Sequence, residues 1–186
     1  SGTHTFGGGF HILSGADVTL SLSGALPLQT ALTIGGWGDS NNSCPFLVLS
    51  NTATNLGTRI NDAQDIYTNS GNLNFTTNTG SATNETAGSL RGAGHSSVTM
   101  TTGGTLNFTD GTNGLQRVGG GTFLFRAGNA LMGSAVATTT VSNVRFSNLP
   151  GSELIGGGGS AGTTTISILP YAIGGVTTGD AGTRLV

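Results

Sequence analysis

The sequence contains no lysine, and charged residues make up only 8% of the chain, against roughly a quarter in ordinary globular domains. All six basic residues are arginines: Arg59, Arg91, Arg117, Arg126, Arg145 and Arg184. The formal net charge is -2. Binding to nucleic acid or to anionic membrane surfaces needs dense groups of Lys and Arg. We therefore expect no nucleic-acid partner.

Cysteine is nearly absent as well, since Cys44 is the only one in the chain. A single cysteine excludes an internal disulfide and a Cys-based zinc cluster. We expect Cys44, which precedes Pro45, to be a small buried hydrophobic residue. An intermolecular disulfide is the alternative.

Long apolar runs and helical periodicity are also missing. No segment approaches the roughly 18 apolar residues of a membrane span, so we expect no membrane insertion. No stretch repeats its apolar residues every 3.6 positions, which predicts almost no helix.

Paired carboxylates, which glycoside hydrolysis requires, are not evident. Only Asp62 and Asp65 lie close together in the sequence, and no lysine can serve as a base or stabilise charge. We predict that the chain is not an enzyme. We also expect no catalytic, cofactor-binding or metal-binding residue, and no cofactor.

Several short motifs match functional patterns by chance in so glycine-rich a chain. Residues 158–162 fit the G-x-S-x-G nucleophile pattern and residues 157–162 fit G-x-G-x-x-G, but both sites require a helix to follow. The β-branched run 163–168 predicts a strand instead. Residues 35–39 resemble a calcium-binding turn with its aspartate one position early. We expect His4, His11 and His95 to be polar surface residues rather than metal ligands.

The residues that dominate are Gly, Ser, Thr and Asn, which form about half of the chain, while 35% of it is hydrophobic. Short apolar clusters alternate with polar residues and are separated by Gly- and Asn-rich turns, which is typical of β-strands. The predicted strands cover residues 17–22, 31–34, 46–49, 73–75, 97–100, 106–108, 123–125, 144–146 and 164–169.

One unit recurs with the form Gly, polar, apolar, polar, apolar. It occurs at 71–75 and 104–108, and more loosely at 121–125. We expect its glycine to adopt the positive φ of a tight corner, with the two apolar residues pointing inward. Stacked copies would bury a continuous apolar column. The sequence therefore predicts an all-β fold, a Gly/Thr/Asn-rich β-solenoid (parallel β-helix), with a β-sandwich as the alternative.

Residues 2–9 followed by 15–20, together with residues 84–94, carry a family resemblance. They read G-T-H-T-F-G-G-G, then G-A-D-V-T-L, and N-E-T-A-G-S-L-R-G-A-G. These stretches resemble the autotransporter-associated β-strand repeat of large bacterial surface and exported proteins. The resemblance implies a β-solenoid with an adhesive, matrix or scaffold role, and it implies no catalytic residues.

We interpret residues 1–186 as a single solenoid segment, part of a longer chain or assembly. The predicted function is that of a structural module outside the cell or on its outer surface: a stalk, matrix or filament-forming element assembled by β-strand stacking. Its expected partners are further copies, joined head to tail or as a filament, or flanking repeats of the same chain, because neither end shows an evident cap. The alternative is a carbohydrate-binding adhesin that uses Trp37, Tyr67 and Tyr171 to bind glycans.

Overall fold

The computed structural model describes residues 8–35, 44–78, 80–128, 131–132, 138–149, 151–160, 164–175 and 184–185. These residues are all-β: they form three sheets and contain no α-helix beyond a short 3-10 turn at Gly151–Glu153. The prediction of an all-β chain is therefore confirmed for the described residues.

The first sheet has five strands, in the order β1 (Phe10–Ile12), β3 (Leu32–Gly35), β5 (Ile66–Asn69), β8 (Leu90–Ala93) and β11 (Leu115–Arg117). All of its strand pairings are parallel. Its innermost positions form one column that runs from Phe10 through Leu32, Ile66 and Leu90 to Leu115. From Leu32 onward these side chains are fully buried.

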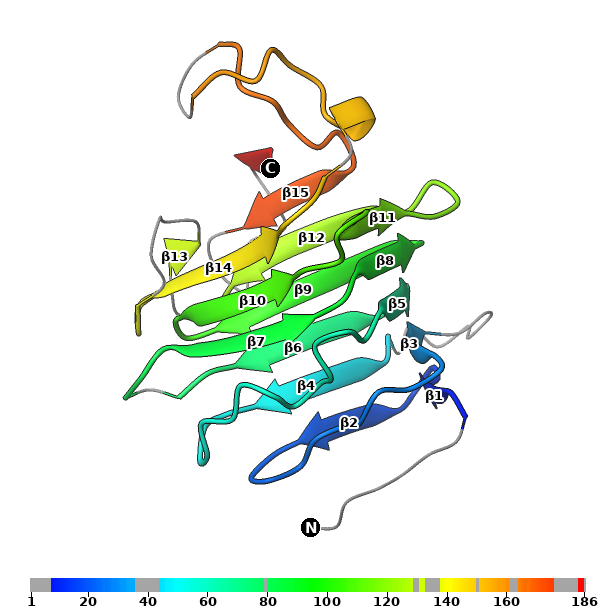
Figure 1. The fold of residues 1–186 in the computed structure, drawn as a ribbon, viewed down its shortest axis with the longest axis vertical. Helices are drawn as coiled ribbons and strands as arrows, with labels where there is room; N and C mark the ends of the chain where they lie inside the picture. The colour runs from blue at the N-terminus through cyan, green and yellow to red at the C-terminus, as the bar shows by residue number, and fades with distance from the viewer. Residues whose placement is uncertain are drawn as a thin grey trace.

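The second sheet has seven strands, in the order β2 (Asp17–Leu20), β4 (Phe46–Ser50), β6 (Asn72–Thr76), β9 (His95–Thr101), β12 (Thr122–Ala127), β15 (Ala172–Gly175) and β16 (Arg184–Leu185). Figure 1 shows these strands stacked from the N-terminal to the C-terminal end of the molecule. All pairings are parallel except that between β15 and β16. Two inward columns lie side by side here, and one of them contains Leu49, Phe75 and Met100.

The third sheet has four strands, in the order β7 (Thr83–Ala87), β10 (Gly104–Phe108), β14 (Val141–Phe146) and β13 (Leu131–Met132), all parallel. It begins only at β7, so the described residues before 83 form no strand on this side. There the described structure holds a single isolated bridge between Leu26 and Ile60.

The chain passes through the first, second and, from β7 onward, third sheet in the same order several times, and we call each such pass a circuit. Circuit 1 is residues 10–31, circuit 2 is 32–65, circuit 3 is 66–89, circuit 4 is 90–114 and circuit 5 is 115–146. Side-chain hydrogen bonds also join neighbouring circuits: Ser97 donates to Asn72, and the hydroxyls of Thr77 and Thr102 are 2.5 Å apart. Polar residues thus reinforce the backbone pairing between circuits.

Eight of the nine predicted strands coincide with observed strands, but most strands of the first sheet were not predicted and one predicted strand is absent. Residues 164–169 form a turn and two isolated bridges rather than a strand. Two of the bridge partners are Ile155 and Gly159, so this β-branched run pairs locally within the C-terminal segment instead of joining a sheet.

The glycine that opens each repeated unit has a different role from the expected one. None of Gly71, Gly104 and Gly121 has a positive φ. A Cβ at these positions would lie 2.3, 2.6 and 2.4 Å from the carbonyl oxygens of Ile34, Thr83 and Gly92, respectively. Each of these oxygens belongs to the preceding circuit. Glycine is needed here because two backbones approach closely, not because the corner is left-handed.

Gly71→Ala is therefore expected to reduce the free energy of unfolding by about 1–3 kcal/mol, as overpacking against backbone does. Gly111→Ala is the matched control, since an added Cβ would meet no atom within 4 Å. Denaturant titration of both variants checks the prediction. Equal destabilisation by the two substitutions would contradict the close-approach explanation.

Candidate functional site

The N-terminal end of the stack exposes apolar side chains. Leu13, Leu22 and Leu28 are 57%, 57% and 54% exposed, and all three belong to circuit 1. Val18 and Leu20, which head the two inward columns of the second sheet, are only partly buried. Their partners in circuit 2, Leu47 and Leu49, are fully buried. The apolar columns thus end without a covering layer among the described residues.

The same end also exposes strand edges. β1 is the first strand of the five-stranded sheet and β2 is the first strand of the seven-stranded sheet. Within the described ranges, each has a neighbour on one side only. Such an edge presents backbone N–H and C=O groups that can pair with another strand. Apolar ends and open edges therefore coincide at circuit 1, and we take this surface as the candidate functional site.

The C-terminal end differs because a non-repeating segment lies over circuit 5. We call this segment, the described residues from 149 to 171, the cover. Leu154, Leu169 and Tyr171 of the cover pack against the core. The Tyr171 hydroxyl donates a hydrogen bond to Glu153, and its ring lies 6.2 Å from that of Phe123. β16 then pairs antiparallel with β15, which interrupts the parallel order of that sheet.

A buried polar network joins the first three circuits on the side of the third sheet, where the described residues of circuits 1 and 2 form no strand. The Arg59 side chain is fully buried. Its guanidinium donates to the carbonyl oxygens of Leu22, Gly24 and Thr54 at 2.8–3.0 Å, and its Nε donates to Asn51 Oδ1 at 2.8 Å. Arg59 therefore attaches the end of circuit 1 to circuit 2.

Glu85 completes this network from circuit 3. It occupies an inward position of β7, beside Leu106 of β10, and is fully buried. Its carboxylate accepts the backbone N–H groups of Arg59 and Ile60 at 3.1 and 2.8 Å. The carboxylate thus satisfies amides that a neighbouring strand would otherwise pair, because the described part of circuit 2 contributes no strand to the third sheet.

Burial raises the pKa of Glu85 to about 7, from an ordinary value of 4.5. The two backbone N–H donors and the positive charge of Arg59 act in the opposite direction, and Asp62 adds a small increase. Burial also lowers the pKa of Arg59, while Glu85 raises it. Neutralisation of a buried carboxylate near physiological pH makes this network sensitive to pH.

The outer face of the five-stranded sheet carries a polar cluster around Tyr67. Arg91 donates to the Tyr67 hydroxyl at 2.7 Å, and its guanidinium carbon lies 5.0 Å from the ring centroid. Arg91 also forms a 2.6 Å ion pair with Asp65, which in turn accepts hydrogen bonds from Ser89. These residues fix one another on the surface of β5 and β8.

The histidines and aromatic residues that the sequence offered as possible metal ligands or glycan-binding residues are not brought together in the described structure. His11 and His95 are exposed on strands of different sheets, while His4 and Trp37 lie outside the described residues. In the described part of the chain, no three His, Cys, Asp or Glu side chains gather to hold a metal ion. Asp62, Asp65 and Asp110 line one surface pocket of about 450 Å³.

The two glycine-rich motifs are not followed by a helix in the described residues. Ser160 is exposed in the cover, and Thr164 and Thr165 form a turn. Residues 161–163 and 36–39 lie outside the described part, and with them most of the calcium-like turn. No helix in the described ranges is long and apolar enough to span a bilayer.

The prediction for Cys44 is wrong, because its side chain is exposed. Inward and outward side chains alternate along the chain as it leads into β4, and this explains the result. Pro45, Leu47 and Leu49 are buried, so Cys44 points outward, as Phe46 and Val48 do.

The Arg59–Glu85 network generates a prediction about pH. The native pKa of Glu85 lies above that of the unfolded chain, so its contribution to stability is fully present below about pH 4.5 and is lost as pH rises through about 7. We expect up to about 3 kcal/mol of stability to be lost over this range. Thermal unfolding at a series of pH values should show this slope in the wild type and a flatter one in Glu85→Gln. Asn84→Gln, on the exposed face of the same strand, is the control and should keep the wild-type slope. A wild-type slope in Glu85→Gln would show that Glu85 is not the group that titrates.

No protein-family model, no curated protein and no solved structure matches this chain. The resemblance to the autotransporter-associated repeat therefore rests on the sequence stretches quoted for it. The geometry of the ends and of the stacked circuits carries the functional argument.

Proposed function

We propose that the five circuits are coils of a β-solenoid and that the chain is a structural module of an exported or cell-surface protein. The parallel pairing of successive circuits supports this fold. Hydrogen bonds join side chains 24 to 27 residues apart, such as Ser89 with Asp65 and Arg126 with Thr99, one circuit to the next. A β-sandwich is ordinarily built from antiparallel strands joined by hairpins and Greek-key connections.

The contrast between the two ends carries the proposal. Circuit 1 ends in half-buried column residues, exposed leucines and open strand edges, whereas the cover lies over circuit 5. A further coil placed on circuit 1 would pair with β1 and β2 and bury Leu13 and Leu28. The partner is a flanking repeat of the same chain or a second copy of it. The covered C-terminal end favours contact through circuit 1 over a head-to-tail filament.

The setting outside the cell rests on the resemblance to repeats of exported surface proteins. The chain has no lysine, few charges and a single cysteine, so strand pairing and buried columns, with the Arg59–Glu85 network, account for its stability without an internal disulfide. Parallel stacking buries most inner residues between neighbouring circuits, and further stacked coils would lengthen the unit along one axis. Such a unit suits a stalk or matrix element.

The carbohydrate-binding alternative has weaker support in the geometry. Tyr171 is only 6% exposed and packs in the core, so it offers no stacking surface. Tyr67 is exposed, but the guanidinium of Arg91 lies over its ring. Among the described residues, a cluster of open aromatic faces is therefore not formed.

The stacking proposal predicts that isolated chains associate through circuit 1. Sedimentation velocity of the wild type should show association that increases with concentration. The double variant Leu13→Lys/Leu28→Lys should remain monomeric, because two charges at this end would be desolvated by a stacked coil. Ile155→Lys places the same charge at an exposed residue of the cover and should behave as the wild type. Equal association of the double variant and this control would contradict the proposal.

A further inference from the structure

The interior of circuit 5 is less completely filled than that of the circuits before it. Leu106 and Phe108 of β10, in circuit 4, are fully buried. Val144 and Phe146 of β14, at the equivalent inward positions of circuit 5, are only partly buried. The layer above them is the cover, which has isolated bridges in place of regular strands. A non-repeating layer cannot fill the space as a further coil would.

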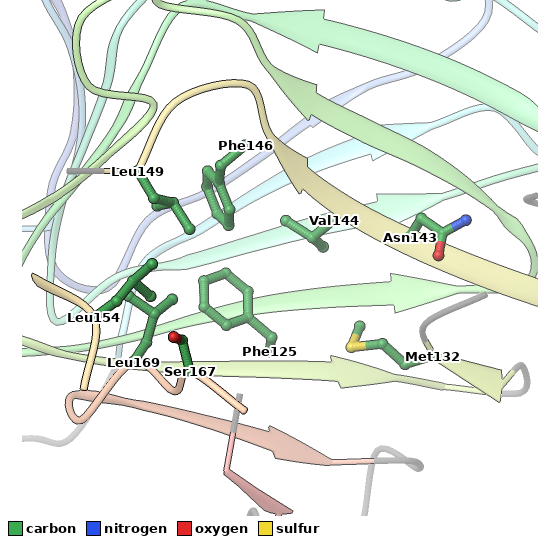
Figure 2. Close-up of a pocket in the computed structure, with 9 residues that line it drawn as sticks. All are labelled: Phe125, Met132, Asn143, Val144, Phe146, Leu149, Leu154, Ser167 and Leu169. Atoms are coloured by element: carbon green, nitrogen blue, oxygen red, sulfur yellow. The ribbon is translucent and has the colours of Figure 1, made fainter. Parts of the chain in front are cut away.

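The space left under the cover is a cavity of about 370 Å³. Figure 2 shows Phe125 from β12 and Phe146 from β14 facing Leu154 and Leu169 from the cover, with Met132 at one side. Contacts with other aromatic rings fix the positions of the two phenylalanines that line the cavity. Phe146 stacks on Phe108 with ring centroids 5.2 Å apart, and it meets the ring of Phe125 edge-on at 5.7 Å.

The lining determines the chemistry of a molecule that could enter. Seven of the nine lining residues are apolar and none is charged; Asn143 and Ser167 are the polar ones. A charged ligand would lose its hydration here without gaining a partner of opposite charge. The Ser167 hydroxyl accepts the N–H of Gly158 at 3.0 Å, so its own hydrogen can be donated to a ligand.

The size of the cavity fits a small molecule. An engineered apolar cavity of about 150 Å³ stays dry and binds benzene. Pockets that bind small molecules begin at about 300 Å³. The present cavity therefore has room for a molecule larger than one ring, such as a fused pair of rings with a small substituent.

We propose that the cavity between circuit 5 and the cover binds an uncharged, mainly apolar small molecule of about two rings that carries one hydrogen-bond acceptor. The aromatic walls of Phe125 and Phe146 contact its apolar body, and the Ser167 hydroxyl donates to its acceptor. This site is separate from the open surface of circuit 1 and does not depend on the proposed structural role.

The two methionines of the chain allow a direct test. Met132 lines the cavity, and Met100 is buried in circuit 4. In protein labelled with ¹³C at the methionine methyl groups, titration with methyl naphthyl ketone should shift the Met132 signal and leave that of Met100 unchanged. Naphthoate, a charged molecule of similar shape, should produce at least tenfold weaker binding.

Matched variants locate the binding. Leu154→Trp fills the cavity and should weaken binding of the ketone at least tenfold, whereas Ile155→Trp, at the neighbouring 60%-exposed position, should leave it unchanged. An unchanged Met100 signal shows that each variant is folded, and Val144→Phe is a second filling variant. The proposal is overturned if the ketone shifts neither methionine or both, if naphthoate binds equally well, or if folded filling variants still bind.

Discussion

The stacking of each circuit directly on the one before is the constraint on which the other features depend. Inward residues must lie above inward residues, as Leu47, Leu73 and Val98 do in the second sheet. Backbones must also approach closely at the corners, and Gly71 makes such a contact with the carbonyl of Ile34. A few apolar residues per circuit then suffice, because each is covered on two sides by residues of the same kind.

Where strands are missing, buried polar groups maintain the same stacking. The third sheet starts at β7, where Glu85 of this strand and Arg59 next to it satisfy backbone groups of circuits 1 and 2. Removing Glu85 would leave the buried backbone N–H groups of Arg59 and Ile60 without an acceptor, which is costly. The same constraint explains why the two ends of the stack are incompletely packed. Among the described residues, circuit 1 has no covering layer, and the cover leaves a cavity next to circuit 5.

The sequence predicted the all-β class and most strands of the second sheet, because period-2 alternation is strong where Val, Leu and Phe point inward. It did not identify β7, whose inward residues are Thr83, Glu85 and Ala87. A glutamate at a core position resembles a surface residue until its backbone partners are known, and nothing near Arg59 marks it as buried. The role of the corner glycines was also misjudged, since close approach between distant backbones is a tertiary feature.

Amide hydrogen exchange, measured where the chain is monomeric, tests the stacking most directly. The account predicts slow exchange for β6 and β9, which have a neighbouring strand on both sides, and much faster exchange for β1 and β2, which end the stack. Faster exchange at β1 and β2, together with their protection on association, would support circuit 1 as the docking end. Exchange at β1 and β2 in the monomer as slow as in β6 and β9 would contradict it.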